Sequence, residues 1–389
     1  MSTIEQKTLV KEQLNNEVCV VVGTRPGIVM FAPIIHELKR TQTPFFILHT
    51  GQHYSPNMDS QLFEDLDLPQ PNYRIEGVSE HRTHGGQTAV MLRGVEDILM
   101  QRKPKVVLVG GDANTNLAAA IAARKLQMIV GHIESGMRSY DWRMPEEHNR
   151  VMIDHISDIC FASDENSARI LQEEKIRGKI MNVGNTIVDT CRQNLDLAQK
   201  KSKILEVLGV QKGKYLLMTT HREENVDNKD NLKNSLQGVS DAAVKIGLPC
   251  ILLAHPRTEK RMQEFGLRDW AEKLPHMRIH PGLAYLDFTM ALSNARLFFT
   301  DSGGGQQEAC VHHIPCITLR DNTEWTDTLL SGANRLAGCD PKKIVQAAED
   351  ALTVPCQWEI PFGDGTAARQ IVAAAREALV KAPELRKVA

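Results

Sequence analysis

Carboxyl groups follow two neighbouring apolar runs in the first half of the chain. Asp112 comes directly after the run KVVLVGG, and Glu134 ends the run MIVGHIE. The loop after Glu134 closes on a second pair of acids, Glu146 and Glu147. Because each environment shifts a carboxyl pKa differently, three such groups near one cleft can divide the work of donating and accepting protons. A single carboxylate at a strand end is often only a helix N-cap, and this interpretation of Asp112 stays open.

The most pointed signal for an anion site is the stretch TDSGGGQQEA (300–309). An apolar strand runs into Asp301, Ser302 and three glycines, and a helical stretch follows. Glycines let a backbone approach a ligand closely, and the N–H groups at a helix start can hold a diphosphate, to which Ser302 donates one more bond. Glu308, about a turn and a half into that helix, can accept the two hydroxyls of a ribose. The alternative is a tight turn between strand and helix that binds no ligand.

Cationic side chains occur at two further turns. In GTRPGIVM, Arg25 follows a β-branched apolar run, and Pro26 starts a segment with helical spacing. The unpaired N–H groups and partial positive charge of that helix start make the turn a plausible anion site, to which Arg25 adds a full charge. The alternative is that Arg25 only forms a surface ion pair. The segment THREEN adds His221 and Arg222, which can neutralise phosphate charge.

Apolar runs of strand length alternate with amphipathic segments along the whole chain. The expected strands of the first half are 18–22, 44–50, 105–111, 128–134, 159–163 and 179–184, and those of the second half are 215–221, 249–255, 277–282, 295–304 and 315–321. Helical spacing is clear in 85–102 and 113–126. Such alternation predicts the α/β class with doubly wound parallel sheets, in which ligands collect at the carboxyl ends of the strands.

The pattern restarts after a long polar helical segment, so the sequence predicts two Rossmann-like domains. The N-terminal domain is expected to span 1–185 and the C-terminal, nucleotide-binding domain 186–365. The last helix, 366–389, is expected to pack back on the first domain. Two such domains facing a central cleft favour a nucleotide-linked substrate, with one domain holding the nucleotide and the other carrying out the chemistry. A chain of 389 residues is also too long for one ordinary domain.

Composition narrows the class of protein. Hydrophobic residues make up 42% of the chain and charged residues 24%, as is normal for soluble globular proteins. The formal net charge is −2 with mixed signs, so no basic stripe favours nucleic acid, and a small partner is expected instead. The polar N-terminus lacks the apolar core of a signal peptide, and no apolar run is long enough to span a membrane. We therefore expect a cytoplasmic protein.

The cysteine positions and the absence of cofactor motifs favour neither disulfides nor a bound cofactor. The eight cysteines are scattered and lie mostly in apolar segments, which is typical of buried free thiols. The cluster CVHHIPC (310–316) offers two thiols and two imidazoles for zinc, but its spacing matches no usual zinc pattern, and a helix end leading into a strand explains it as well. No GxGxxG or GxxxxGK[ST] motif occurs, so neither a dinucleotide cofactor nor ATP hydrolysis is indicated.

Together these segments resemble the non-hydrolysing UDP-N-acetylglucosamine 2-epimerase family over almost the whole chain. The motifs, in order, are GTRP, GDANT, HIESGMRS, MPEEHNR, GNTIVD, THREEN, TDSGG and LRDNTEW. The resemblance implies the GT-B architecture, a homodimer, no metal and no redox cofactor. It also implies reversible inversion at C2 of UDP-N-acetylglucosamine to UDP-N-acetylmannosamine, by anti elimination of UDP to a 2-acetamidoglucal and re-addition.

The resemblance also assigns site residues by motif. As catalytic positions it implies Asp112, Glu134, Glu146, Arg150 and His221. As positions that bind the nucleotide or the substrate it implies Arg25, Met30, Arg138, Arg222, Ser302, Gly303, Gly304, Glu308 and Arg320. Inversion requires that a proton leaves one face of C2 and arrives at the other, so at least two acid or base groups must flank the ring. Which carboxylate serves which face stays open.

The chain departs from the family pattern at two places, and both leave the sugar open. Met30 stands where the family more often has a lysine that adds a cation to the cleft, although plain packing also explains Met30. The segment TEWTD (323–327) stands where many members read TERPE, and it resembles members that act on modified sugars such as diacetamido uronic acids. The rival functions are a hydrolysing epimerase that releases UDP and N-acetylmannosamine, a GT-B glycosyltransferase, and a non-catalytic binder of UDP-sugars.

Overall fold

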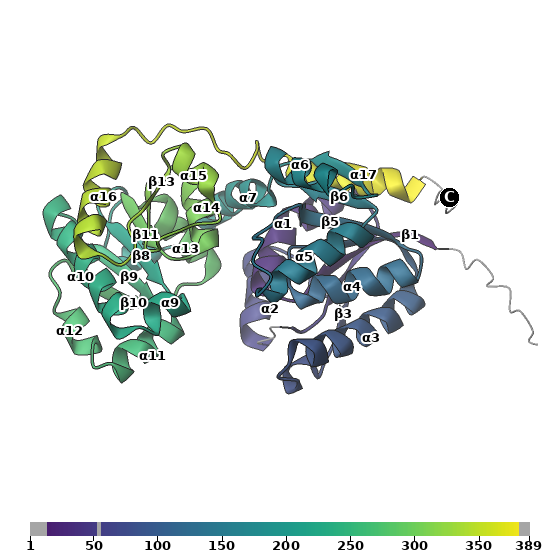
Figure 1. Cartoon of the computed structure of the whole chain (residues 1–389), viewed down its shortest axis with the longest axis horizontal. Coiled ribbons are helices and arrows are strands. Elements are labelled where there is room, and N and C mark those ends of the chain that lie inside the picture. The colour runs from purple at the N-terminus through teal and green to yellow at the C-terminus, as the bar shows by residue number, and fades with distance from the viewer. Residues whose placement is uncertain (1–13, 53–55, 381–389) are drawn as a thin grey trace, which may run out of the picture. The chain divides into compact units, whose positions relative to one another are not determined.

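The chain folds into two compact units, each built around one parallel sheet (Figure 1). The computed structural model describes residues 14–52 and 56–380, without the side chains of 56–59. Residues 381–389 of the expected last helix lie outside the described residues. Of the described residues, the N-terminal unit takes 14–52, 56–60, 69–183 and 368–380, and the C-terminal unit takes 61–68 and 184–367.

The N-terminal unit contains a seven-stranded parallel sheet with the strand order β3-β2-β1-β4-β5-β6-β7. Its strands are β1 (Asn15–Val22), β2 (Phe45–His49), β3 (Tyr73–Arg74), β4 (Pro104–Gly110), β5 (Ile129–Ser135), β6 (Ile159–Ala162) and β7 (Lys179–Asn182). Its helices are α1 (Arg25–Arg40), the 3₁₀ helix η1 (Val78–Glu80), α3 (His84–Arg102), α4 (Asn114–Lys125), α5 (Pro145–Ile156), α6 (Glu165–Glu173) and α17 (Ala367–Val380), with α2 (Pro56–Asp65) shared between the units.

The first strand and helix show how local sequence positions a site. The valines at 20–22 are buried in β1, as expected for a strand that is covered on both faces. Thr24 then caps α1 by accepting a hydrogen bond from the Gly27 N–H at 3.2 Å, and Pro26 lies in the first turn. The helix therefore starts at the turn that carries Arg25.

Helices α3, α4 and α5 pack on one face of this sheet. Cys19 and Val107 from the strands form a buried cluster with Met91 and Val95 of α3 and with the alanines of α4. Each fully buried large apolar side chain contributes about 1.5–3 kcal/mol relative to exposure. This packing fixes the positions of the strand ends at which the polar residues gather.

The C-terminal unit contains a six-stranded parallel sheet with the strand order β10-β9-β8-β11-β12-β13. Its strands are β8 (Leu216–Thr220), β9 (Cys250–Ala254), β10 (Met277–Pro281), β11 (Leu297–Thr300), β12 (Cys316–Thr318) and β13 (Asn334–Leu336). Its helices are α7 (Thr186–Lys201), α8 (Ile204–Leu208), α9 (Glu223–Val226), α10 (Lys229–Ile246), α11 (Pro256–Glu264), α12 (Arg268–Glu272), α13 (Tyr285–Ser293), α14 (Gly303–Val311), α15 (Thr326–Leu330) and α16 (Pro341–Thr353).

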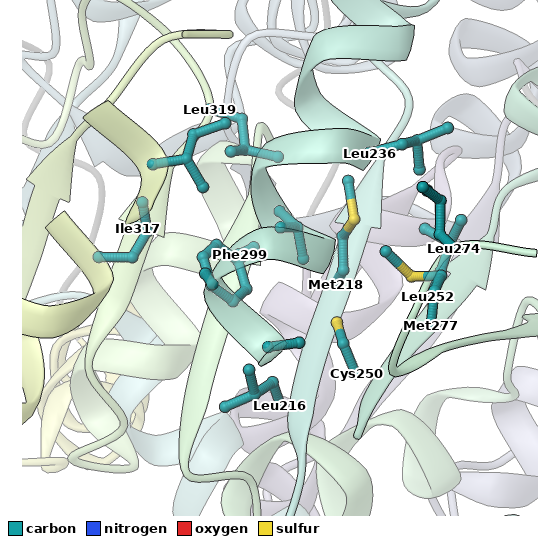
Figure 2. Close-up of a cluster of buried hydrophobic side chains, with 14 of the residues drawn as sticks. Leu216, Met218, Leu236, Cys250, Leu252, Leu274, Met277, Phe299, Ile317 and Leu319 are labelled. Atoms are coloured by element: carbon teal, nitrogen blue, oxygen red, sulfur yellow. The ribbon is translucent and has the colours of Figure 1, made fainter. Parts of the chain in front are cut away.

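One face of the C-terminal sheet carries the cluster shown in Figure 2. Met218 of β8, Leu252 of β9 and Phe299 of β11 lie there with Leu236 of α10. On the opposite face, Phe298 belongs to a second cluster that includes residues of α8, α13 and α14. Because successive strand residues point to opposite faces, β11 is buried on both sides, and its polar carboxyl end is the exception.

In both sheets the strand order reverses beside the first strand of the unit. The reversal lies between β1 and β4 in the N-terminal sheet and between β8 and β11 in the C-terminal sheet. In open α/β sheets, ligands bind outside the carboxyl ends of the strands at such a reversal, because the connections there leave in opposite directions. The residues that follow these four strands are therefore the candidates for a site.

The predicted α/β class with two doubly wound parallel sheets is confirmed. The strand expected over 295–304 ends at Thr300, because Ser302 caps α14 and the glycines form the first turn of that helix. The short strands β3 and β13, of 2 and 3 residues, go beyond the prediction because they are too short for a periodic pattern. None of the described helices is long and apolar enough to cross a membrane.

The last helix lies in the unit where it was expected, and one short segment does not. Helix α17 packs in the N-terminal unit, where Lys105 of β4 donates to the Leu379 carbonyl oxygen at 2.5 Å. The segment 61–68, expected in the N-terminal domain, groups with the C-terminal unit instead. There, Lys201 of α7 pairs with Asp67 at 2.8 Å. This ion pair joins residues that are far apart in the sequence, so the local sequence does not show which unit the segment 61–68 joins.

Candidate functional site

Asp112, which follows β4, is held by an ion pair and is not a helix cap. The N-cap of α4 is Ala113, whose side chain makes no capping bond. The Nη2 and Nε groups of Arg150 both donate to Asp112 Oδ2, at 2.6 and 3.0 Å. The Asp112 side chain is 36% exposed, whereas that of Arg150 is 14% exposed. A partly exposed carboxylate therefore stands at the reversal point of this sheet, oriented by a more buried guanidinium.

Glu147 and Glu146 are neighbours on α5 but have different surroundings. The buried Glu147 carboxylate accepts hydrogen bonds from the N–H groups of Ser139 and Tyr140, each at 2.9 Å, and from Arg150 at 2.7 Å. Burial alone raises the pKa of Glu147, but these bonds hold it below its ordinary value. Glu146 is half-buried, and its side chain makes no hydrogen bond or ion pair with any residue in the described ranges. Of the two, Glu146 is the one available for proton transfer.

Glu134 stands at the end of β5 in a backbone conformation that few residues other than glycine adopt. Its φ is +61°, and the pairing between β5 and β6 shifts register at this point. A Cβ atom on Gly111, which has a φ of +75°, would lie 3.7 Å from the Glu134 carboxylate and 3.4 Å from the Met30 methyl group. Gly111 directly precedes Asp112, so Glu134, Met30 and the Asp112 backbone meet at one edge of the sheet.

Met30 covers the two glycines that precede Asp112. A Cβ atom on Gly110 would lie only 2.7 Å from the Met30 sulfur, so a larger residue at 110 would displace this side chain. The thioether therefore packs against the end of β4. Its position beside Glu134 makes the difference between methionine and lysine a difference in charge within the candidate site.

The two other predicted arginines of this unit have opposite surroundings. Arg25 lies in the first turn of α1 with an exposed side chain, and it forms no ion pair within the part of the chain that the structure describes. The Arg138 side chain is 1% exposed and donates to Asp154 at 2.7 Å and to Glu174 at 2.6 Å. Arg25 is therefore available to a ligand, whereas Arg138 is committed inside the unit.

Helix α14 begins with an open turn directly after β11. Ser302 is its N-cap, and the Ser302 hydroxyl accepts a hydrogen bond from the Gly305 N–H at 3.2 Å. Gly304 is exposed, and nothing lies within 4 Å of the position that a Cβ atom would take on it. A helix N-terminus carries unpaired N–H groups and a partial positive charge. The N–H groups of Gly303 and Gly304 are therefore placed to receive an anion.

The carboxylate of Asp301 holds the loop that carries His221 and Arg222. It is fully buried and accepts hydrogen bonds from the N–H groups of His221 at 3.0 Å and Arg222 at 3.1 Å. The Thr220 hydroxyl at 2.6 Å and the Asn225 amide at 3.0 Å complete its donors. His221 Nδ1 lies 3.5 Å from the same carboxylate, which orients the ring. Asp301 thus ties the ends of β8 and β11 together, a role that the sequence prediction does not contain.

Glu324, from the segment TEWTD, places a carboxylate at the N-terminus of α14. It pairs with Arg320 at 2.9 Å and lies 3.7 Å from Arg222. A Cβ atom on Gly303 would clash with Glu324 Oε1. Burial raises the pKa of Glu324, but a backbone hydrogen bond and the charges of Arg320 and Arg222 hold it below its ordinary value. The Glu324 carboxylate, an anion of the protein itself, therefore lies beside three of the predicted binding residues, Gly303, Arg222 and Arg320.

Glu308, the predicted ribose acceptor, is buried with one oxygen unsatisfied. The Tyr285 hydroxyl donates to Glu308 Oε1 at 3.3 Å, and Oε2 has no hydrogen-bond partner among the described residues. Burial raises the pKa of Glu308 to about 7, against the lowering effect of the Tyr285 bond. A buried acceptor without a donor is uncommon, so this oxygen is suited to a ligand hydroxyl. Tyr285 of α13 is therefore a further candidate, and the sequence prediction lacks it.

The CVHHIPC segment runs from the end of α14 to β12. Cys310 lies in the helix, Cys316 begins the strand, and both thiols are buried and free. Burial raises the pKa of Cys310 to about 12 and lowers the pKa of His312 to about 4. In the described part of the chain, no three His, Cys, Asp or Glu side chains are grouped as they would be around a metal ion. In the structure, this segment is the end of a helix that leads into a strand.

Comparisons with known proteins give the family of this chain. A family model described as UDP-N-acetylglucosamine 2-epimerase matches residues 36–376. The chain is 45% identical over 356 residues to the UDP-N-acetylglucosamine 2-epimerase of Methanocaldococcus jannaschii, covering 91% of this chain and 97% of that protein. It is 36% identical over 361 residues to the UDP-2,3-diacetamido-2,3-dideoxy-D-glucuronate 2-epimerase of Pseudomonas aeruginosa, covering 91% and 98%.

A solved structure is similar over nearly the same length. The crystal structure of the Methanocaldococcus jannaschii UDP-GlcNAc 2-epimerase in complex with UDP-GlcNAc and UDP matches with a TM-score of 0.81 at 44% identity, covering 92% of this chain and 99% of that chain. This match confirms the predicted GT-B-type fold class. Since the family model and the relatives each cover most of its length, the chain belongs to the UDP-N-acetylglucosamine 2-epimerase family.

Proposed function

We propose that the protein interconverts UDP-N-acetylglucosamine and UDP-N-acetylmannosamine by inverting C2 of the sugar. The observation that carries this proposal is the placing of Asp112 and Glu134 at the ends of adjacent strands, with Gly111 in contact range of the Glu134 carboxylate. Glu146 lies in the first turn of α5 without a partner among the described residues, which adds a third candidate acid or base. Membership of the epimerase family supports the same reaction.

The first step of this reaction is the departure of UDP, because the hydrogen on C2 is not acidic while the nucleotide is attached. The C1–O bond breaks and its electron pair leaves with the diphosphate, so donors that are already oriented toward that charge lower the barrier most. In the C-terminal unit, the N–H groups of Gly303 and Gly304 and the Arg222 guanidinium are the proposed donors to the departing diphosphate. The unsatisfied oxygen of Glu308 accepts the ribose hydroxyls.

The second step is the loss of a proton from C2. A carboxylate takes the proton, the electron pair of the C–H bond forms the C1–C2 double bond, and 2-acetamidoglucal results. Protonation of C2 on the opposite face and return of UDP to C1 give the epimer. Asp112, Glu134 and Glu146 are the proposed acid and base groups, and Arg150 orients Asp112.

A second candidate substrate is a UDP-linked diacetamido uronic acid. The observation that favours it is Trp325, whose Nε1 group has no hydrogen-bond partner within the described ranges. That group would lie 3.2 Å from a Cβ atom on Gly303, so it adds a donor beside the helix start of α14. A relative that is 36% identical carries the name of an epimerase for such a sugar.

One assay separates these possibilities. The protein is incubated with UDP-N-acetylglucosamine in D₂O, and the C2 proton is followed by NMR. Deuterium at C2 with UDP still attached supports the proposal, whereas free UDP and free N-acetylmannosamine indicate a hydrolysing epimerase. Exchange only with the diacetamido uronate substrate supports the second candidate. Binding of both sugars without exchange contradicts an epimerase.

We also propose that the protein acts as a homodimer, as the family resemblance implies. The chain has a mass of 43.5 kDa, so light scattering on the purified protein distinguishes one copy from two. A mass near that of one chain at assay concentration contradicts this proposal.

A further inference from the structure

A buried network lies behind the two strand ends that lead to Asp112 and Glu134. It contains His132 of β5, Asp154 of α5 and Arg138 from the loop between these elements. The three side chains are at most 1% exposed. Groups this deeply buried do not act on a substrate directly, so their effect must pass through the backbone that they hold.

His132 connects the two strand ends. Its Nδ1 lies 2.7 Å from Asp154 Oδ1, and its Nε2 lies 3.0 Å from the carbonyl oxygen of Gly111, the residue before Asp112. A carboxylate and a carbonyl oxygen are both acceptors. With a proton on each nitrogen, the His132 ring donates both hydrogen bonds, so the doubly protonated ring is the form that matches these two acceptors.

Asp154 receives donors from both sides of this turn. Beside the His132 bond on Oδ1, its Oδ2 accepts the Gly136 N–H at 3.1 Å and Arg138 Nη1 at 2.7 Å. Burial raises the pKa of Asp154, but the hydrogen bond and charge of His132 and the charge of Arg138 hold it below its ordinary value. Asp154 is therefore ionised, which is the state in which it can only accept from His132.

The other titratable groups that face the network leave its charge balanced. Arg138 also pairs with Glu174 of α6 at 2.6 Å. The Cys160 thiol of β6 lies 3.7 Å from the Asp154 carbonyl oxygen, and burial raises the pKa of Cys160, so this thiol stays neutral. With His132 doubly protonated, two cations thus meet two carboxylates, which is the condition under which buried charges are tolerated.

Two hydrogen bonds enclose Glu134, one between the backbones of β4 and β5 and one from the network. Before it, the carbonyl oxygen of Ile133 accepts the Gly111 N–H at 3.0 Å, and after it, the Gly136 N–H donates to Asp154. Glu134 lies between these bonds with its φ of +61°. A left-handed conformation of this kind costs on the order of 1–3 kcal/mol and persists only where the surroundings hold it. The enclosing bonds provide that hold.

We propose that His132 and Asp154 are positioning residues for Glu134. The His132 imidazolium fixes the end of β4 to Asp154, and Asp154 fixes the turn that presents the Glu134 carboxylate. This inference rests on the proposed function in one respect, that Glu134 acts on C2 of the sugar. Neither His132 nor Asp154 touches the substrate in it.

A first experiment reads His132 without any substrate. The full chain is labelled with ¹⁵N in its histidines, and the ring nitrogens are observed at about pH 8, where an exposed imidazole is neutral. The chain has 14 histidines, so the His132 signals are assigned as those lost in His132→Gln. We expect two protonated ring nitrogens. One unprotonated nitrogen would overturn the imidazolium bridge whatever reaction the protein catalyses.

A second experiment compares Asp154→Asn with a matched control, Asp158→Asn. Asp158 also accepts a backbone N–H of β5, that of Val130 at 3.0 Å, but at the strand end far from Glu134. We expect Asp154→Asn to lower kcat for C2 exchange by about tenfold or more while KM and the Kd for UDP change by less than about twofold, since misplacement of a reacting group acts on kcat. Asp158→Asn is expected to leave all three within about twofold.

The outcomes of this comparison are distinct from those for the function itself. An unchanged kcat in Asp154→Asn, or an equal loss in Asp158→Asn, contradicts the positioning role. If Asp154→Asn does not fold, as judged by near-ultraviolet circular dichroism, His132→Gln is measured in its place, with the same expected split between kcat and KM. Absence of exchange in the unmodified protein overturns the proposed function, and the ¹⁵N experiment then still decides the imidazolium bridge.

Discussion

Each unit has one fully buried aspartate behind its candidate site residues, but the partners of the two aspartates differ in charge. In the N-terminal unit, Asp154 faces the Arg138 guanidinium and the His132 ring, which is a second cation in the doubly protonated form proposed above. In the C-terminal unit, Asp301 accepts hydrogen bonds from backbone N–H groups, a hydroxyl and an amide, all of them neutral. The His221 ring lies 3.5 Å from the same carboxylate.

This difference in charge indicates which kind of group each unit places at its strand ends. The charge of Asp154 is balanced, so it orders the backbone around Glu134 without adding a net negative charge behind the acids. The charge of Asp301 is not balanced by its neutral donors, and it lies behind a loop that carries His221 and Arg222. A buried negative charge favours cations nearby, because little solvent screens it. One unit therefore presents acids and the other presents donors for an anion.

The largest expected effect comes from removing the acid that the N-terminal unit presents. Glu134→Gln should lower the rate of deuterium exchange at C2 by about 10²–10⁴-fold, the usual range for loss of a general acid or base. The Kd for UDP should not change, because the proposed UDP donors belong to the C-terminal unit. Exchange is measured by NMR in D₂O, and UDP binding by calorimetry.

The control for this change is Glu173→Gln on α6, where the carboxylate is 61% exposed and pairs with a surface arginine. It should leave exchange and UDP binding unaltered. Turnover that survives in Glu134→Gln removes Glu134 from the mechanism. A loss of UDP binding in this variant contradicts the division of work between the two units.

The next largest effect concerns Glu308, the buried acid in the unit that otherwise presents donors. Its pKa is about 7 in the folded protein, raised by burial from 4.5. As pH rises from about 4.5 to 7, the unfolded chain loses this proton first, so the folded state is destabilised progressively, by at most about 3 kcal/mol. Glu308→Gln should therefore raise the free energy of unfolding at about pH 8 and change it little at about pH 4.5.

Denaturant unfolding of the ligand-free protein at both pH values measures this difference. Glu349→Gln on α16 is the matched control, because its carboxylate is 35% exposed and makes an ion pair with Lys245. This variant should show no gain in stability at the higher pH. An equal gain at both pH values for Glu308→Gln would show that packing, and not ionisation, decides the effect.

The sequence shows which strand ends carry polar residues, because an apolar run and the residue that ends it are local features. Asp112, Glu134 and Ser302 are found this way, and each stands at a strand end or helix start in the structure. The partners of buried groups are not local. His132 bonds to Asp154, 22 residues away, and Thr220 donates to Asp301 across 81 residues.

A partial signal for the buried network does exist in the sequence. Glu147, Arg150 and Asp154 follow one another at helical spacings of three and four, so they share one face of α5. That face predicts a polar network, but it does not identify His132 as the partner. No comparable signal places Glu324 beside Gly303, because a loop after β12 brings them together. The sequence therefore reveals the functional groups better than their supports.

A smaller effect is expected where the C-terminal unit already holds an anion of its own. The Glu324 carboxylate lies beside Gly303 and pairs with Arg320 and Arg222, so it competes with a diphosphate for the same donors. Glu324→Gln keeps the shape and removes the charge. UDP should bind about three- to tenfold more tightly, the range expected for charge-assisted hydrogen bonds of moderate strength.

Calorimetry at low and high salt measures this change. The gain should shrink at high salt, because the competing charges are partly exposed and become screened. Glu264→Gln, which removes another carboxylate paired with an arginine in this unit, is the control. Weaker UDP binding in Glu324→Gln would mean that Glu324 supports the ligand instead of competing with it.

The smallest effect is expected from introducing a cation beside the acids of the N-terminal unit. Met30 packs over Gly110 and lies beside the Glu134 carboxylate, so Met30→Lys places an ammonium group at the edge that carries the acids. We expect KM for UDP-N-acetylglucosamine to fall by about two- to threefold, with a change in kcat below about twofold, since a partly exposed charge contributes up to about 1 kcal/mol. Met30→Leu keeps the packing without the charge and should leave KM unchanged. If both variants alter KM equally, packing governs this position. If neither does, residue 30 lies outside the reach of the diphosphate, and the charge difference between the units is then a property of the C-terminal donors alone.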